Sequence, residues 1–153
     1  MTLDRDKSLE QTRRSVSLFL KESREERIDR HKRLKEVMIG YGDGVKTLIT
    51  FKDLMLFDVG ARNELSEGVF FEKTYHSEDK MVFTTYMEKG GSFGIHSHEC
   101  IEICNVLKGN LIERERGYKV YNKGESIIYA KNEDHRPYAT EESVYEVIFL
   151  RDI

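Results

Sequence analysis

The sequence has no long apolar run, only two cysteines and no large excess of either charge. No stretch approaches the roughly 20 apolar residues that a membrane-spanning helix needs, so we expect no membrane segment. Residues 1–11, MTLDRDKSLEQ, have acids where a signal peptide has a basic start and an apolar core, so we predict no targeting segment. Cys100 and Cys104 lie too close together for good disulfide geometry. Two free thiols suit a reducing cytoplasm, where we expect the protein.

What the sequence does contain is typical of one folded domain. A chain of 153 residues buries roughly two-thirds of the surface of its unfolded form, which is enough for a proper core without disulfides. Hydrophobic residues make up 39% and charged residues 35% of the chain, as in a soluble globular protein with a heavily solvated surface. The formal net charge of −3 favours neither a nucleic acid nor a membrane as a partner.

Residues 1–44 are predicted to form a helical N-terminal extension. Ser8-x-x-Gln11 and Ser23-x-x-Glu26 both match a capping box, in which a hydroxyl accepts from a free backbone N–H and the later side chain reaches back. We expect two helices, or one helix with a break near residues 21–23, ended by the glycines that follow. Two apolar stripes at helical spacing support this prediction: Leu9, Val16, Phe19 and Leu20 form the first, and Leu34, Val37, Met38 and Tyr41 form the second.

This extension is also mildly basic. Residues 1–42 contain 11 Lys/Arg against 8 Asp/Glu, whereas the remainder contains 14 against 20. The helices could therefore be a scaffold that packs on the rest of the chain or on a second subunit, or they could dock on a protein or nucleic-acid partner. Because their acids dilute the positive charge, the sequence does not favour nucleic-acid binding.

Residues 45–153 are predicted to form an all-β domain. Short β-like runs such as VKTLITF, DLMLFDV, MVFTTYME and SVYEVIFL follow one another at fairly regular intervals. Turn signals such as KGG, KGN and NKG separate several of them. Many short strands at regular spacing indicate an antiparallel sandwich or a closed barrel.

Four side chains in this domain could bind a metal ion. His96 and His98 project to the same face of a strand, because side chains alternate along it. Glu102 follows four residues later, where a tight bend could return it to that face, and His135 is the one good further candidate downstream. Three imidazoles and one carboxylate suit Fe, Mn, Ni, Zn or Cu as a divalent ion, whereas Ca²⁺ and Mg²⁺ prefer oxygen ligands.

The spacing of these residues resembles the two motifs of the cupin superfamily. The first motif is matched at every spacing by Gly90-(x)5-His96-x-His98-(x)3-Glu102-(x)6-Gly109, and Gly124-(x)5-Ala130-x-Asn132-(x)2-His135 resembles the second. The resemblance covers roughly residues 66 to 150. It implies an antiparallel jelly-roll β-barrel with one metal ion inside one end, and it implies that His96, His98, Glu102 and His135 hold that ion.

The second motif departs from the family at three positions. Ala130 replaces the usual proline, Asn132 the usual glycine and Ala139 the frequent closing asparagine. None of the three is a metal ligand in the family, so the departure concerns the shape of the loop more than metal binding. The resemblance further implies a homodimer.

Other residues near the motifs have plain structural interpretations. Cys104 should share the inward face with Glu102, either as a small buried hydrophobic residue or as a reactive thiol beside the metal. Arg114 and Arg116 alternate with Glu113 and Glu115, which indicates paired surface charges on a hairpin. The aromatic residues expected in or near the barrel are Phe83, Tyr86, Tyr129 and Tyr138.

Two functions from different classes fit these features, because a fold alone does not fix a function. The first, which the full ligand set favours, is a metal-dependent enzyme of the dioxygenase, isomerase or lyase type. Its substrate would be a small oxygen-rich molecule, such as a sugar acid or keto acid, that chelates the metal. The second is a non-catalytic sensor or binding module for a small ligand, whose N-terminal helices contact a partner.

Overall fold

The computed structural model describes residues 23–42 and 45–151. The chain divides into two compact units, residues 1–33 and 34–153, and the sheets and the site lie in the second unit. The boundary predicted between residues 44 and 45 stays a prediction. In the described part of the chain, no helix is long and apolar enough to cross a membrane.

The described helix of the extension, α2, runs from Arg24 to Gly42. At its start the Glu26 N–H donates to the Ser23 hydroxyl over 3.1 Å, as the capping motif predicts. The predicted second stripe is confirmed as its packed face, because Val37 and Tyr41 are buried while Leu34 and Met38 pack against the core. The capping motif at Ser8 and the first stripe lie outside the described residues.

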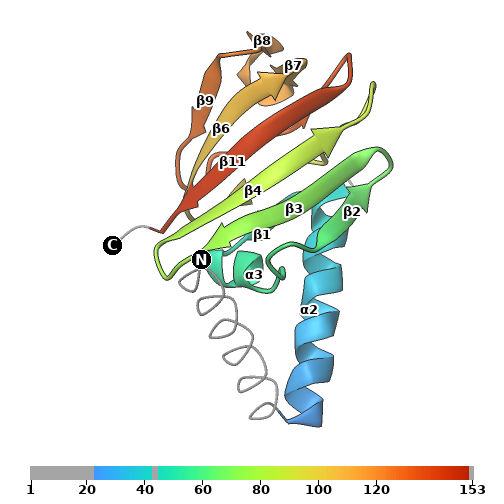
Figure 1. Cartoon of the computed structure of the whole chain (residues 1–153), viewed down its shortest axis with the longest axis vertical. Helices are drawn as coiled ribbons and strands as arrows, with labels where there is room; N and C mark the ends of the chain where they lie inside the picture. Colours follow the sequence, from blue (N-terminus) through green and yellow to red (C-terminus); the bar gives the residue numbers. More distant parts are fainter. Residues whose placement is uncertain (1–22, 43–44, 152–153) are drawn as a thin grey trace, which may run out of the picture. The chain divides into compact units, whose positions relative to one another are not determined.

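The rest of the second unit is mostly strands, which form three sheets (Figure 1). The largest has six strands in the order β2-β3-β4-β11-β6-β9, all antiparallel, and a three-stranded antiparallel sheet has the order β10-β7-β8. The third sheet is the parallel pair β1-β5. The elements are β1 Thr47–Ile49, α3 Phe51–Met55, β2 Arg62–Ser66, β3 Val69–His76, β4 Lys80–Met87, β5 His96–His98, β6 Ile101–Lys108, β7 Asn110–Glu113, η1 Arg114–Arg116, β8 Lys119–Asn122, β9 Ser126–Tyr129, β10 Pro137–Tyr138 and β11 Ser143–Leu150.

The last strand, β11, lies in the middle of the large sheet between β4 and β6 (Figure 1). Its residues alternate between buried and half-exposed along its whole length, which is the pattern of a strand with one face on a core. Insertion of the final strand between two earlier ones is the non-sequential order expected of a jelly roll. The predicted antiparallel jelly-roll fold is therefore confirmed.

The prediction of a closed barrel is wrong, because the sheets do not join edge to edge. The strands at the motif histidines are too short to continue a ladder: β5, which carries His96 and His98, has three residues, and β10, which begins two residues after His135, has two. In the described residues, β2 and β9 are therefore edges of the large sheet. The result is a jelly-roll sandwich in which no strand of the smaller sheets pairs with a strand of the large one.

One predicted strand is a helix. The run DLMLFDV overlaps α3, Phe51–Met55, because Thr50 and Asp53 form a complete capping box that its apolar residues had masked. The Asp53 N–H donates to the Thr50 hydroxyl, and the Thr50 N–H donates to the Asp53 carboxylate. Two such bonds satisfy backbone donors that favour a helical turn over an extended chain.

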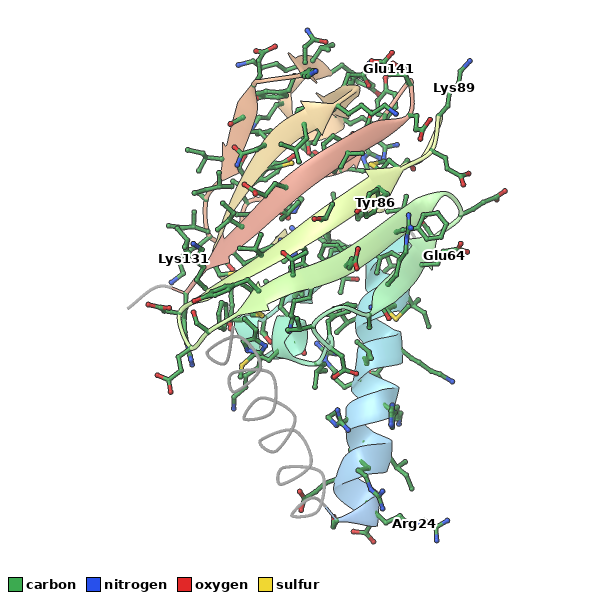
Figure 2. The ribbon with its side chains drawn as sticks, viewed as in Figure 1. Arg24, Glu64, Tyr86, Lys89, Lys131 and Glu141 are labelled. Carbon is green, nitrogen blue, oxygen red and sulfur yellow. The ribbon has the colours of Figure 1, made fainter. Side chains whose placement is uncertain are left out.

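The inner face of the large sheet is filled with aromatic rings. Phe71 and Phe83 stack with their centroids 4.0 Å apart, and Phe57 and Phe149 contact Phe83 edge-on. Phe83 and Tyr129 are buried as predicted, whereas Tyr86 is half-exposed on the outer face. Figure 2 shows Tyr86 of β4 on that outer face, in a view that shows β2 and β3 beside it. This cluster of phenylalanines reaches the histidines at one point, since the Phe149 ring also lies 4.7 Å from the His98 ring, centroid to centroid.

Candidate metal centre

Backbone pairing brings the predicted histidines together. His96 and His98 begin and end β5, and the backbone of His135 pairs with that of His96 through two hydrogen bonds, of 3.0 and 2.8 Å. The Asn132 N–H donates to the His98 carbonyl oxygen over 2.7 Å and holds the loop before His135 against the same strand. The long separation of His135 from His96 and His98 in the sequence is therefore no obstacle to their proximity.

The three imidazoles form one buried cluster. Each of them offers a ligand atom, and these atoms all lie within 4.8 Å of one another. None of the three side chains is more than 2% exposed. Burial lowers the pKa of His96 to about 4 and lowers the pKa values of His98 and His135 well below their usual range. The rings are therefore neutral at physiological pH, which is the form that binds a metal ion.

Each histidine has one ring nitrogen in a hydrogen bond. His96 Nδ1 lies 2.7 Å from the Gly94 carbonyl oxygen, and His135 Nδ1 lies 3.0 Å from that of Glu133. A carbonyl oxygen only accepts, so both Nδ1 atoms carry the proton and both Nε2 atoms keep a lone pair. Hydrogen bonds of this kind orient the rings of histidines that bind metals.

The buried nitrogens that remain fit a cation. His98 Nδ1 and His135 Nε2 are buried and have no hydrogen-bond partner among the described residues. A buried ring nitrogen without a hydrogen-bond partner is unusual in a folded protein and indicates a group that the protein atoms do not supply. Three neutral imidazoles that converge in this way suit a first-row transition metal ion.

Glu102 lies beside the cluster but is not part of it. Its Oε2 is 3.6 Å from His135 Nε2, which is longer than a hydrogen bond. Burial, followed by repulsion from Glu113, raises the pKa of Glu102 to about 8. Without a cation the carboxyl group therefore carries a proton at neutral pH, and a bound cation would reverse this preference. The structure brings the three histidines together. The set of four ligands that includes Glu102 stays a prediction.

Two histidines of the cluster, His96 and His135, line a small, mainly apolar cavity. The volume open to the centre of a water molecule is about 30 Å³, which holds one or two waters. Phe71, Phe93 and Phe149 contribute apolar walls, whereas Thr85 contributes a hydroxyl. The Thr85 side chain is 1% exposed, and its oxygen has no hydrogen-bond partner among the described residues. A molecule in this cavity would meet few polar groups besides the histidines.

Two tyrosines that the sequence interpretation named, but did not assign to the histidines, support them. The Tyr41 hydroxyl, at the end of α2, lies 2.8 Å from His98 Nε2. The Tyr129 ring stacks on His135 at a centroid distance of 4.0 Å, and its hydroxyl donates to Glu113 over 2.8 Å. The sequence links neither tyrosine to a histidine. Tyr41 is 57 residues from His98, and Tyr129 is predicted only as one of several aromatic residues near the barrel.

The prediction that Glu113 lies on the surface is wrong. Its side chain is 0% exposed and accepts hydrogen bonds from the Tyr129 hydroxyl and from the backbone N–H groups of Arg136 and Glu115. The alternation of β7 contained the signal, since Glu113 is two residues after the buried Leu111 and therefore projects to the same side. These donors satisfy the carboxylate inside the protein.

Cys104 agrees with its structural interpretation. It is 3% exposed, has a free thiol and lines the cavity. Burial raises the pKa of this thiol well above its usual value, so it stays protonated. A protonated thiol is a poor nucleophile, and Cys104 is therefore best described as a small hydrophobic residue of the cavity wall.

Comparison with known proteins gives results at the level of the fold. No protein-family model matches the chain, and no curated protein matches it significantly. An RmlC-like cupin from Shewanella frigidimarina NCIMB 400 is similar over 61% of this chain and 85% of its own, with 16% identity and a TM-score of 0.56. At this level of identity the similarity shows the fold alone.

Two further similar structures are of proteins that have specific names. KdgF from Halomonas sp. is similar over 60% of this chain and 87% of its own, with 19% identity and a TM-score of 0.54. An acetylacetone dioxygenase from Acinetobacter johnsonii is similar over 61% of this chain and 65% of its own, with 17% identity and a TM-score of 0.50.

Proposed function

We propose that this chain, which has the cupin fold, is a metal-dependent enzyme that acts on a small oxygen-rich molecule. The observation that carries the proposal is the buried cluster of His96, His98 and His135. Each ring has one hydrogen-bonded nitrogen, and the second nitrogens of His98 and His135 are buried without a partner in the described residues. A protein that needed only a stable core would gain nothing from three buried imidazoles with unpaired nitrogens.

The ion in this proposal is one divalent transition metal of the set Fe, Mn, Ni, Zn or Cu. The three histidines would hold it, with Glu102 as a fourth ligand whose carboxyl group already faces His135. When bound, such an ion can polarise a chelated carbonyl group or place dioxygen beside the substrate.

The remaining groups of the site orient the substrate and handle protons. The apolar walls exclude water, which strengthens polar interactions inside the cavity. The Thr85 hydroxyl, which is buried without a partner, can bond to a substrate oxygen. Glu102 can hold or release a proton at its carboxyl oxygen, next to the histidines.

The walls also narrow the substrate class. The phenylalanine-rich walls favour a small keto acid or diketone over a sugar acid, because few polar groups are available to bind many hydroxyls. Similarity of fold to a protein named acetylacetone dioxygenase is consistent with such a substrate. A substrate of this size would have to widen the cavity to enter.

This function can be tested by turnover. Protein loaded with each candidate metal would be screened with diketones, keto acids and sugar acids, with oxygen uptake and product formation as readouts. We expect turnover of a diketone or keto acid by the wild type and a kcat/KM about 10-fold lower for a Thr85→Val variant, because the substrate loses one hydroxyl contact. Ligand binding without turnover under every metal would contradict the enzyme proposal.

That last outcome would support the second function, a non-catalytic sensor. One observation favours it. Tyr41 lies in the last turn of α2 and contacts His98, so a ligand in the cavity could influence the helix. The helices would then change their contact with a protein partner according to whether a ligand occupies the cavity. In either case we propose a cytoplasmic homodimer in which the all-β domain spans residues 45–153.

A further inference from the structure

The end of α2 is fixed against the site by close backbone contacts. The Gly94 N–H donates to the Tyr41 carbonyl oxygen over 2.7 Å, and Gly94 also accepts the hydrogen bond from His96. A side chain at Gly40 would come within 2.6 Å of Thr47, so the helix approaches the start of β1 as closely as glycine allows. Tyr41 is therefore held in place by its own backbone and its neighbours.

The Tyr41 side chain is enclosed by the walls of the cavity. It is 2% exposed, and its ring contacts Phe71, Phe93 and His96 edge-on at centroid distances of 5.7, 5.8 and 4.8 Å. Its hydroxyl reaches His98 Nε2 at 2.8 Å. This is the one hydrogen bond between α2 and the three histidines within the described residues.

The direction of this hydrogen bond decides which nitrogen of His98 is free. If Tyr41 donated to Nε2, the proton of a neutral His98 would be on Nδ1, which is buried without any acceptor in the described residues. Buried N–H groups without an acceptor are rarer than unpaired acceptors. If His98 Nε2–H donates to Tyr41 instead, Nδ1 has a lone pair that a metal ion can satisfy.

In the second arrangement, each of the three histidines donates a hydrogen bond from one ring nitrogen and keeps a lone pair on the other. His96 and His135 each donate from Nδ1 to a backbone carbonyl and keep Nε2 free. His98 donates from Nε2 to a side-chain hydroxyl and keeps Nδ1 free. We propose that His98 binds the metal through Nδ1 and that Tyr41 is the positioning residue that fixes this tautomer. This inference rests on the proposed metal site and deepens it.

The arrangement leaves the Tyr41 hydroxyl proton available. Because the oxygen accepts from His98, its own O–H can donate to a molecule in the cavity, which Tyr41 lines. The extension that precedes the β domain thus contributes a group to the site.

The test uses Zn²⁺, which is diamagnetic, as the probe. Long-range proton–nitrogen NMR correlation of the Zn²⁺-loaded protein shows which nitrogen of each histidine carries the proton. We expect a proton on Nδ1 for His96 and His135 and on Nε2 for His98. A proton on Nδ1 of His98 in the loaded wild type would overturn the proposal.

Affinity gives a second readout. Tyr41→Phe keeps the ring that packs on Phe71 and Phe93, so the fold should survive, as circular dichroism would show. We expect its affinity for Zn²⁺, measured by chelator competition, to fall about 10- to 100-fold, as for other residues that orient metal ligands. An unchanged or higher affinity would overturn the proposal.

A matched control removes a hydroxyl elsewhere. Tyr121 is also buried, and its hydroxyl accepts from Arg116 over 3.2 Å, away from the cavity. Tyr121→Phe should therefore leave both the affinity and the His98 tautomer unchanged. If the wild type binds neither Zn²⁺ nor another of the candidate metals, the proposed function fails together with this inference. If it binds Zn²⁺ and Tyr41→Phe changes nothing, this inference alone fails.

Discussion

Replacement of His96 by alanine should lower the affinity for first-row divalent ions about 1000-fold and leave the fold intact. His96 is central to the cluster. Its backbone pairs with that of His135, and the centroid of its ring lies 4.1 Å from that of His135 and 5.2 Å from that of His98. Loss of one of three converging ligands at about 4 kcal/mol corresponds to this factor.

The fold should survive because the aromatic core does not depend on the histidines. Phe57, Phe71 and Phe83 pack on one another, and the backbone bonds between residues 96 and 135 need no side chain. Metal titration with a competing chelator measures the affinity, and circular dichroism with thermal melting measures the fold.

A matched control is available for this experiment. His31 lies on an exposed part of α2, so His31→Ala should bind metal as the wild type does. If His96→Ala unfolds outright, the ion is structural and the enzyme proposal weakens. If it binds metal as tightly as the wild type, the cluster is not the site.

Replacement of Glu113 by alanine should have the largest effect on stability among the residues around the site. The free energy of unfolding should fall by about 3 kcal/mol, because at least two buried donors lose their acceptor. These donors are the Tyr129 hydroxyl and the Arg136 N–H, at 2.8 and 3.0 Å from Oε1 of Glu113. Metal affinity should fall as well, since Tyr129 would no longer be held in its stack on His135.

Urea denaturation of the metal-free protein measures this change in stability. Glu113→Gln keeps one oxygen acceptor and should lose less stability than Glu113→Ala. Glu142→Ala removes an exposed partner of Lys108 at 3.7 Å, and exposed pairs of this kind contribute about 0.5 kcal/mol. A Glu113→Ala variant as stable as Glu142→Ala would show that the buried carboxylate does not hold the site together.

The sequence was sufficient to predict the histidine cluster because its signal is local. Alternation places His96 and His98 on one face, and the spacing of the second motif identifies His135. The rhythm of short strands and turns indicated an antiparallel sandwich or barrel, and the jelly roll followed from the resemblance to the cupin motifs. Barrel closure did not, because it depends on whether strands as short as β5 and β10 can continue a ladder, and no pattern in the sequence gives that length.

The remaining features depend on contacts between distant residues. Tyr41 had been assigned to the apolar stripe of a helix, and its stripe is indeed packed, but nothing in that stripe indicates that its hydroxyl meets His98. The charged neighbours of Glu113 indicate a surface position. Its place in β7 indicates the opposite, because Glu113 lies two residues after the buried Leu111 and projects to the same side. In α3, a local capping box favours a helix where the apolar run DLMLFDV predicts a strand.

The metal content of the purified protein tests the account most directly. Untagged protein would be examined by elemental analysis as isolated, and then again after metal removal and incubation with Fe, Mn, Ni, Zn or Cu. The account predicts close to one first-row transition metal ion per chain, bound in competition with protons because the histidines must be neutral. Protein that is isolated without metal and takes up none of the five ions would contradict it.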